Sequence, residues 1–278
     1  MLNVKEMFRK ESLMYTSLVP KLEDNFFPSC YHATGDLIVL ENLLIRGYRH
    51  PKRGSPLDAA HCKLVLSQLG RLHAKAHHLY LSGTPSISSV SVEVLYTPER
   101  IRYFSQLAQD TISVIRRTPT TSKYSSNVED ILKDAYDHLL KCLNFKGKLQ
   151  TLIHGEVYAE NLMFSYSADE PKNVKILDLQ TCRVGSALLD VVQFLYTSTT
   201  ADTRDAYMDD LLRTYHWSLT RSLRQVGSDT VVSFMELRRE IDSLAIFGFL
   251  SVHLQPHDHL FQKTITDVVL DLAERGVL

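Results

Sequence analysis

Apolar residues recur along the chain with two spacings, and these spacings predict where helices and strands lie. Between Leu2 and Leu22 they fall every three to four positions, which predicts an amphipathic helix ending near Pro20. Residues 29–33 and 37–41 are instead two short, mainly apolar runs around a Thr-Gly-Asp turn, as expected for a β-hairpin. The chain is therefore predicted to begin with a helix and a small antiparallel sheet.

Helical spacing returns after a polar and basic linker over residues 42–56. The next helix is expected over residues 57–79, and a loop rich in Ser, Gly and Pro follows at residues 82–91. Further helices are expected over residues 98–116, 128–143, 188–196, 202–223, 230–253 and 264–274. Residues 149–180 break this series, with two apolar runs joined by a polar turn at 167–173. Strands early and in the middle, with helices dominating the end, predict an α+β protein.

The two apolar runs of residues 149–180 carry the best candidates for chemistry. The first ends in His154-Gly155-Glu156, and Asn161 follows five residues after the acid, which gives the pattern HxExxxxN. The related pattern HxDxxxxN is the catalytic loop of protein kinases, in which the acid orients the acceptor hydroxyl and the Asn binds a metal. Taken alone the pattern is weak, because a solvated loop carboxylate explains Glu156 equally well.

Asp178, in the second apolar run, strengthens this interpretation. An Asp flanked by Ile176, Leu177 and Leu179 is costly to bury without a partner, so it needs a cation or several hydrogen-bond donors. Metal binding is the leading account. Asn161 and Asp178 would then hold Mg²⁺ on the phosphates of ATP, as phosphoryl-transfer sites of the protein-kinase type require.

Other polar residues have simpler explanations. Asp190 begins an apolar helix, where the helix dipole stabilises an acid, and a buried brace for the catalytic-type loop is the competing role. Glu11 is by default a solvated helix residue. His73 and His77, spaced i, i+4, could share a metal, but no third ligand accompanies them, so no metal site is expected there.

Composition and charge exclude several classes of protein. Apolar residues make up 44% of the chain and charged residues 23%, and the formal net charge is −1. These values are typical of a globular protein and give no bulk electrostatic attraction for nucleic acid or a membrane surface. The four cysteines are far apart, with no spacing typical of a zinc site or a disulfide framework. With no secretory signal and no apolar run long enough to span a bilayer, a cytoplasmic location is expected.

Several motifs spread along the chain belong to one known pattern. Phe8, Glu11, Tyr15 and Pro20 match a helix written F-x-x-E-x-x-x-Y-x-x-x-x-P. Further matches are Val39-Leu40-Glu41-Asn42-Leu43 to an LVLEDL hinge, Leu69-Gly70-Arg71-Leu72-His73-Ala74 to an LA-x-LHA helix, His154 to Asn161 to HGD-x-x-x-x-N, Leu177-Asp178-Leu179-Gln180 to IDFQ, and Gly185-Ser186 with Asp190 and Thr197-Ser198-Thr199 to a G-S-x-x-x-D … TS helix. Taken together, they cover nearly the whole chain and resemble the insect ecdysteroid-kinase-like family. This family, also called CHK-kinase-like, lies within the aminoglycoside-phosphotransferase and choline-kinase-like group.

The resemblance implies a fold, two cofactors and a set of roles. It implies an α+β, protein-kinase-like two-lobe fold with a truncated N-terminal lobe and a mainly helical C-terminal lobe, divided into residues 1–45 and 46–278. It also implies ATP and Mg²⁺ as cofactors and a small steroid-like hydroxyl compound as substrate. By this resemblance, Leu40, Glu41, Asn42 and Leu43 would contact adenine through backbone groups, and Glu11 would pair with the lysine that anchors the phosphates. His154 would belong to the catalytic loop, with Glu156 at the position of the base. Asn161 and Asp178 would bind the metal, and Asp190 would be a structural brace.

Two departures from the family pattern leave three hypotheses open. The family normally carries a glycine-rich loop and a lysine ahead of the Glu11 helix, and the ten residues before Glu11 leave no room for them. The base position holds Glu156 instead of Asp, which moves the carboxylate by about 1 Å, a misplacement that can cost on the order of 10²-fold in rate. The chain is then an ATP-dependent small-molecule kinase, a pseudokinase or ligand-binding protein without turnover, or an incomplete reading of the gene for an active kinase.

Overall fold

The computed structural model describes residues 4–52, 55–97, 101–254 and 261–278. The predicted first helix is present, but its winding changes along its length. Helix α1 (Val4–Leu13) continues into a π-helical turn, Met14–Leu18, and a 3₁₀ turn, Val19–Leu22. The predicted hairpin is confirmed, with strand β1 (Cys30–Ala33) antiparallel to β2 (Ile38–Leu40).

The middle of the chain forms two further small sheets. Strand β4 (Gln150–Ile153) pairs antiparallel with β7 (Arg183–Ser186). A three-stranded antiparallel sheet has the order β3 (Tyr48–Arg49), β5 (Leu162–Ser167) and β6 (Glu170–Ile176). Ala168 and Asp169 join β5 to β6, both with positive φ, as a tight two-residue hairpin turn requires.

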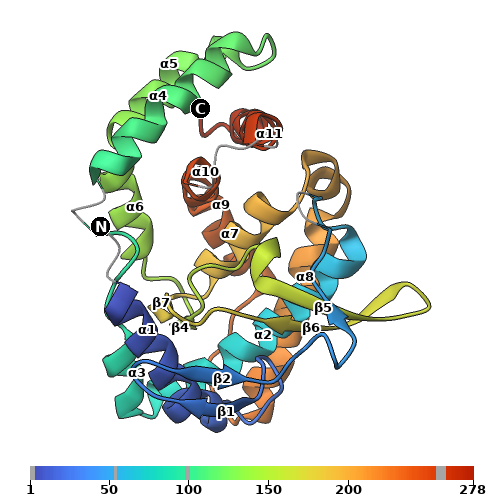
Figure 1. Ribbon diagram of the computed structural model, residues 1–278. Coiled ribbons are helices and arrows are strands. Elements are labelled where there is room, and N and C mark those ends of the chain that lie inside the picture. The colour runs from blue at the N-terminus through green and yellow to red at the C-terminus, as the bar shows by residue number, and fades with distance from the viewer. Residues whose placement is uncertain (1–3, 53–54, 98–100, 255–260) are drawn as a thin grey trace.

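Helices make up most of the remaining structure. They are α2 (Ala59–Leu81), α3 (Pro85–Val90), α4 (Ile101–Arg117), α5 (Ser125–Lys133), α6 (Ala135–Leu143), α7 (Leu188–Ser198), α8 (Ala201–Gln225), α9 (Phe234–Ser243), α10 (Ala245–His253) and α11 (Phe261–Glu274). Figure 1 shows the β1–β2 hairpin with α1 and α3 at one end of the molecule, and α4, α5, α10 and α11 at the other. The α+β class and the mainly helical C-terminal region are confirmed. The division into residues 1–45 and 46–278 stays a prediction.

Several predicted boundaries were wrong in detail. The loop expected at residues 82–91 contains helix α3, which starts at Pro85, a residue suited to the first turn of a helix. The linker expected at 42–56 contains strand β3, whose pairing with β5 depends on residues far away in the sequence. The single helix expected at 230–253 divides at Leu244 into α9 and α10.

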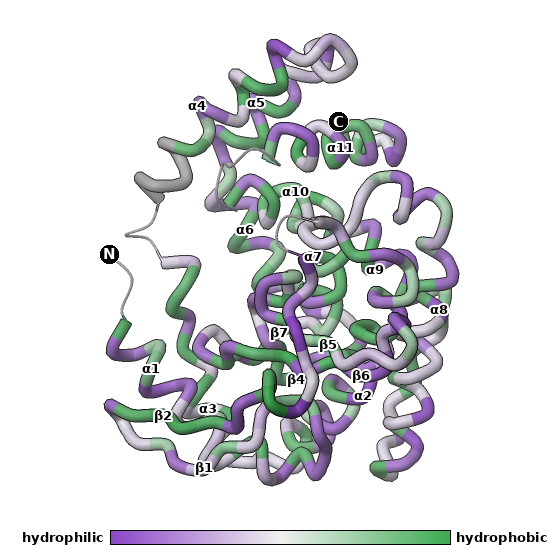
Figure 2. Tube along the Cα trace, turned by 45° about the vertical axis from the view of Figure 1, so that its right-hand side comes forward, coloured by the Kyte–Doolittle hydropathy of each residue, from purple (hydrophilic) through white to green (hydrophobic). Residues whose placement is uncertain are grey.

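Close helix packing places the elements around the site. Helices α2 and α8 approach so closely that a Cβ on Gly70 would lie 2.7 Å from the backbone oxygen of Tyr215. Helices α7 and α10 meet in the same way, since a Cβ on Gly248 would lie 2.5 Å from the ring of Tyr196. Helix α10 is hydrophobic over most of its length and runs through the helical region (Figure 2). This packing fixes α2 and α7, which carry residues that contact the catalytic-type loop.

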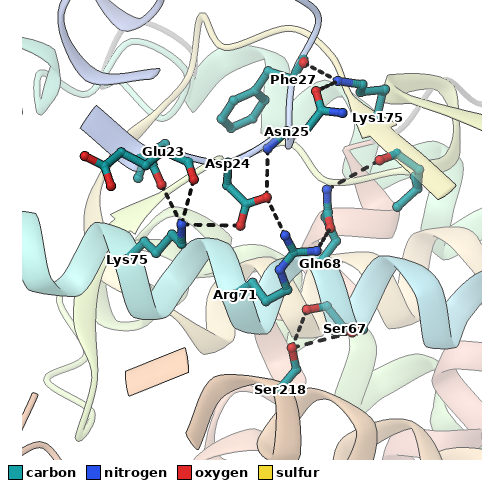
Figure 3. A network of polar contacts seen from close by, with 12 residues as sticks. Glu23, Asp24, Asn25, Phe27, Ser67, Gln68, Arg71, Lys75, Lys175 and Ser218 are labelled. Carbon is teal, nitrogen blue, oxygen red and sulfur yellow. Dashed lines mark hydrogen bonds and ion pairs between the residues drawn. The ribbon is translucent and has the colours of Figure 1, made fainter. Parts of the chain in front are cut away.

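A polar network anchors the segment between α1 and β1 to the body of the protein (Figure 3). The carboxylate of Asp24 accepts a hydrogen bond from Arg71, and Lys75 Nζ lies 3.4 Å from its Oδ2. Lys75 also donates to the backbone oxygens of Leu22 and Glu23, both at 2.9 Å. Charged hydrogen bonds of this kind are among the stronger ones in proteins. The chain that follows α1 is therefore held firmly on helix α2.

Strand β6 contributes a second anchor to the same segment. Lys175 is buried, donates to the side chain of Asn25 and lies 2.7 Å from the backbone oxygen of Phe27. The amide of Ile176 donates to the backbone oxygen of Phe26 at 3.0 Å. Because β6 leads directly to residue 178, these contacts tie the end of α1 to the strand that delivers Asp178.

In the part of the chain that the structure describes, no helix has both the length and the apolar character needed to cross a membrane.

Candidate active site

Asp190 binds the backbone at the start of the catalytic-type loop. Its carboxylate, 1% exposed, accepts hydrogen bonds from the backbone amides of His154 (2.7 Å) and Gly155 (2.8 Å) and from His73 Nε2 (3.1 Å). Burial by itself would raise the pKa of Asp190, but the hydrogen bond from His73 and the other donors bring that pKa below its ordinary value. Of the two roles considered for Asp190, the brace agrees with this geometry.

The imidazole of His154 links the two halves of the site. Its Nε2 lies 2.9 Å from the backbone oxygen of Leu177, and its Nδ1 accepts from the backbone amide of Glu156 at 3.3 Å. Because Nδ1 accepts, the proton is on Nε2 and the ring is neutral. Burial lowers the pKa of His154, which favours this neutral form. His154 is therefore a connector between the loop and residue 177.

Backbone geometry at Gly155 turns the loop toward Glu156. Gly155 has a φ of +89°, in the left-handed region that glycine adopts without a steric penalty. A side chain there would also collide with the guanidinium of Arg183 and would lie 2.8 Å from the backbone oxygen of Thr181. The hydroxyl of Thr181 donates to the backbone oxygen of His154 at 3.0 Å. The loop can therefore follow this path only with glycine at position 155.

Hydrogen bonds between the two runs bring Asn161 next to Asp178. The ladder of β5 and β6 continues past its last strand pair, with the amide of Leu177 donating to the backbone oxygen of Asn161 at 2.8 Å. The Asn161 side chain, 8% exposed, uses Nδ2 to donate to the backbone oxygen of Glu156 at 3.0 Å. This bond closes the loop between the two residues, and the same side chain carries Oδ1, an oxygen of the type that binds metal ions.

Asp178 occupies an unusual backbone conformation beside a second acid. Its φ is +67°, a strained value for a residue with a side chain, and such strain occurs preferentially at functional sites. Gln180 Nε2 donates to Asp178 Oδ2 at 3.0 Å. The carboxylate of Glu11 accepts from the amide of Leu179 at 3.2 Å, so helix α1 places a second acid against the same turn. The default interpretation of Glu11 as a solvated helix residue was therefore wrong.

In the described part of the chain, Asp178 and Glu11 have no cationic ion-pair partner. Burial raises the pKa of Asp178, and burial followed by the charge of Asp178 raises the pKa of Glu11. Among the residues that the structure describes, neither carboxylate forms an ion pair with Lys, Arg or His. A carboxylate pair without a countercharge is costly in a partly buried position. The pair therefore has the properties of a cation site.

These residues fit Mg²⁺ held together with a nucleotide. Mg²⁺ prefers oxygen ligands and is usually bound by one or two carboxylates plus phosphate oxygens and water, without an all-protein cage. Asp178 and Asn161 supply such oxygens. In the described chain no group of three or more His, Cys, Asp and Glu could hold a metal ion by itself, so a metal here would need ligands from the nucleotide.

Glu156 lies on the surface side of the loop and is half-buried. Its backbone is fixed on both sides, by the amide donating to His154 and by the carbonyl accepting from Asn161. The next amide, that of Val157, donates to Gln193 of helix α7 at 2.9 Å. The acid therefore projects from a rigid loop.

The residues predicted to form the hinge, Leu40–Leu43, follow strand β2 and form a turn held by hydrogen bonds. The Glu41 carboxylate accepts from the amide of Ser29 at 2.8 Å, a bond that lowers its pKa, and lies 3.9 Å from Lys175 Nζ. Within the described residues, the backbone oxygen of Glu41 and the amide of Leu43 form no hydrogen bond. Asn42 accepts from the amide of Leu44, which shapes the turn. The side chains of Glu41 and Asn42 therefore shape this turn, and the Glu41 oxygen and the Leu43 amide have no hydrogen-bond partner among the described residues.

The two histidines of helix α2 that were considered as metal ligands, His73 and His77, have structural partners. His73 donates to Asp190 and its Nδ1 lies 2.9 Å from the hydroxyl of Tyr215. His77 Nδ1 lies 2.6 Å from the backbone oxygen of Gln150, and its Nε2 lies 2.9 Å from the hydroxyl of Thr230. His73 therefore belongs to the brace beneath the loop, a role that its sequence position did not indicate.

Sequence reasoning missed several supporting residues. Gln193 holds the loop from α7, Thr181 holds it from the turn after Asp178, and Arg183 packs against Gly155. Their one sequence signal is proximity to the motifs: Thr181 and Arg183 directly follow the Asp178 turn, and Gln193 lies three residues after Asp190.

Comparisons with known proteins place this site in a family. The model of the Ecdysteroid kinase-like family matches residues 1–228. A search of curated proteins returns no match. Among solved structures, Plasmodium vivax ethanolamine kinase matches with a TM-score of 0.51 and 14% identity, over 100% of this chain and 74% of that chain. Choline kinase from Cryptosporidium parvum matches with a TM-score of 0.52 and 14% identity, over 99% of this chain and 80% of that chain. These structures share the protein-kinase-like fold, and the family match extends over most of the sequence: this chain belongs to the ecdysteroid kinase-like family.

Proposed function

We propose that this protein is an ATP-dependent phosphotransferase that phosphorylates a hydroxyl group of a small molecule. The observation that carries the proposal is the convergence of Glu156, Asn161 and Asp178 on one loop system. Asp190 fixes the start of that loop, and the Leu177–Asn161 backbone bond fixes its end. Catalysis of phosphoryl transfer depends mainly on positioning and electrostatics, which a loop held at both ends can provide.

Each residue has a role that follows from its position. Asn161 and Asp178 would hold the metal, and Glu11 would add negative charge at the same place. Glu156 would accept a hydrogen bond from the acceptor hydroxyl and orient it. Mg²⁺, when bound with ATP, would neutralise the charge of the phosphate oxygens. Two features support this assignment: the strained backbone of Asp178, and its carboxylate, which has no ion-pair partner among the described residues.

The hinge supports the use of a nucleotide. An adenine ring offers one donor and one acceptor along its edge. The backbone oxygen of Glu41 and the amide of Leu43 supply the complementary acceptor and donor, and neither forms a hydrogen bond within the described chain. The Glu41 carboxylate is occupied by hydrogen bonds from Ser29, so we propose that a nucleotide would bind the backbone groups of Glu41 and Leu43 instead.

The family and the fold favour a small alcohol as the acceptor. The family is described as ecdysteroid kinase-like, and the two structures named above are an ethanolamine kinase and a choline kinase. All three descriptions point to a small molecule with a hydroxyl group. We therefore propose a steroid-like alcohol as the first acceptor class, with amino alcohols as the comparison class.

The test is phosphorylation of a defined panel of alcohols. Purified protein would be incubated with Mg²⁺ and ATP and with an ecdysteroid, choline or ethanolamine, and the phosphorylated product would be detected by mass spectrometry. Substituting Glu156→Gln should lower kcat by about 10²- to 10⁴-fold, because it removes the carboxylate that orients the hydroxyl. Glu156→Asp should raise kcat, since it shortens the side chain to the length usual in the family.

A matched control lies four residues away on the same loop. Glu160 is exposed, and Glu160→Gln removes the same charge from the same segment of the chain. It should leave turnover unchanged. Nucleotide binding without turnover of any alcohol would instead favour a ligand-binding protein or pseudokinase. Equal turnover by wild type and Glu156→Gln would contradict the role of Glu156.

A further inference from the structure

Residues 89–96, which we call the bridging segment, connect helix α1 to the catalytic loop through a series of side-chain contacts. The segment runs from the end of α3 to Tyr96 and buries Val90 and Val94 completely or nearly so. These apolar anchors fix its path across the protein. Polar contacts join it to Lys10, the neighbour of Glu11 on helix α1, and to Arg183, which lies against Gly155 of the catalytic-type loop.

The first end of the bridging segment holds helix α1. Arg9 Nη2 donates to the backbone oxygen of Ser89 at 3.1 Å, and Lys10 Nζ donates to that of Val92 at 2.6 Å. Lys10 is 0% exposed, and burial lowers its pKa to about 8. A buried ammonium group tolerates little movement away from its acceptor. Because Glu11 is the next residue, the position of the bridging segment determines where Glu11 lies.

The second end holds the catalytic loop through an ion pair. Glu93 Oε1 accepts from the amides of Leu95 (2.7 Å) and Tyr96 (2.9 Å), which folds the bridging segment around its carboxylate. Glu93 Oε2 lies 3.0 Å from Arg183 Nε. The guanidinium of Arg183 packs against Gly155, the residue before Glu156, and Nη1 contacts the backbone oxygen of Thr181 at 3.4 Å.

The Arg183 side chain is 6% exposed, yet its Nη2 forms no hydrogen bond with any residue that the structure describes. An unsatisfied buried donor has a free-energy cost, and proteins usually retain one where it serves a role besides stability. The position of this guanidinium against the catalytic loop, with Glu93 as its single anionic partner among the described residues, makes it sensitive to movement of the bridging segment.

We propose that the Glu93–Arg183 pair is a positioning element that couples helix α1 to the catalytic loop. Movement of α1 is transmitted through Lys10 and the bridging segment to Arg183, and from there to the backbone of Gly155. Glu11 and Glu156 therefore take their working positions together. The consequence for turnover rests on the proposed function, but the coupling itself is a property of the folded protein that can be measured without substrate.

Hydrogen exchange followed by mass spectrometry tests the coupling. Glu93→Gln keeps the size of the side chain and removes its charge at a position that is partly exposed, so the variant is expected to fold. Exchange should accelerate by about tenfold in two separate peptides, one over residues 5–12 and one over residues 153–161, while peptides from α7 and α8 keep their protection. Arg183→Lys keeps the charge but not the planar fork, and should accelerate the same two peptides by a smaller factor.

The control breaks a comparable pair elsewhere. Glu129 pairs with Arg116 at 2.5 Å on the exposed surface of α4 and α5, and Glu129→Gln should leave both peptides unchanged. Faster exchange in the loop peptide alone, or no change in either peptide, would overturn the coupling. Faster exchange throughout α7 and α8 would also overturn it, because the pair would then be only structural. If both peptides respond and no alcohol is phosphorylated, the coupling stands and the proposed function fails.

Discussion

Two carboxylates of the same site, the partly buried Asp178 and the fully buried Asp190, illustrate two ways of placing an acid in a protein. Asp190 receives two backbone amides and a histidine, and its pKa lies below the ordinary value. Asp178 receives hydrogen bonds only from Gln180 among the described residues, lies near Glu11, and has a raised pKa. The first acid is saturated by the protein, whereas we propose that a bound cation completes the second.

This difference separates structural residues from reactive ones. A saturated acid contributes to stability and loses that contribution when its donors are removed. An unsaturated acid costs stability in the isolated protein and recovers it when a cation binds. The same fold therefore stabilises the loop through Asp190 and retains an electrostatic cost at Asp178. The predictions below test each half of the comparison, from the largest expected effect to the smallest.

Asp190→Ala should produce the largest loss of stability. It would leave the amides of His154 and Gly155 and the ring of His73 buried without an acceptor. Removing one partner from such a buried charged network costs about 3–5 kcal/mol. The free energy of unfolding, measured in urea, should fall by that amount. A loss of less than about 1 kcal/mol would mean that Asp190 is not the brace.

Asp24→Asn should have an intermediate effect that depends on pH. Burial by itself would raise the pKa of Asp24, but the amide of Asn25 and the guanidinium of Arg71 lower it below its ordinary value of 3.8. A lowered pKa stabilises the folded state at pH values above the unfolded pKa, and this stabilisation is lost as the pH falls through the folded pKa. At pH 7 the variant should be less stable by about 1–3 kcal/mol, the usual worth of hydrogen bonds to charged groups.

The pH dependence identifies the cause of that loss. Unfolding by urea would be compared between wild type and Asp24→Asn from neutral pH down to below 3.8. The difference should shrink at the acid end, because the wild-type carboxylate is then protonated as well. A difference that is independent of pH would show that the side chain acts through its shape and not its charge.

Asp178→Asn and Glu11→Gln should change the stability of the isolated protein least. Unlike the substitutions of Asp190 and Asp24, they should not lower it. Each removes one of two neighbouring negative charges without changing the size of the side chain. The free energy of unfolding in the absence of metal should stay the same or rise by up to about 1 kcal/mol. If either substitution lowers the free energy of unfolding by more than about 1 kcal/mol, that carboxylate is a structural group like Asp190.

Local patterns predicted the elements near the site better than their mutual contacts. The helix before Pro20, the hairpin around Gly35 and the HxExxxxN loop were visible because each depends on residues close in sequence. The pairing of β3 with β5 was not visible, because a two-residue strand carries no periodic signal. The helix at 85–90 was hidden by its Ser and Pro content, which is equally typical of loops.

Site residues that act through long-range contacts were the hardest to predict. The spacing of the first helix indicated a solvated Glu11, and only the family resemblance placed this acid in the site. Its position beside Asp178 depends on the anchoring of α1 by Lys10 and by the Asp24 network. Arg183 carried no motif of its own, because its role depends on contact with Gly155 and Glu93. Such roles arise from packing and not from spacing along the chain.

The central claim, that Asp178 is left for a metal–nucleotide complex, is tested most directly by calorimetric titration with a non-hydrolysable ATP analogue. The titration would be run with and without Mg²⁺, on wild type and on Asp178→Asn. Wild type should bind the analogue about tenfold or more tightly with Mg²⁺, because the metal joins the phosphates to Asp178 and Asn161. Asp178→Asn should lose this metal dependence and keep the metal-free affinity. Binding by wild type that is the same with and without Mg²⁺ would contradict the claim.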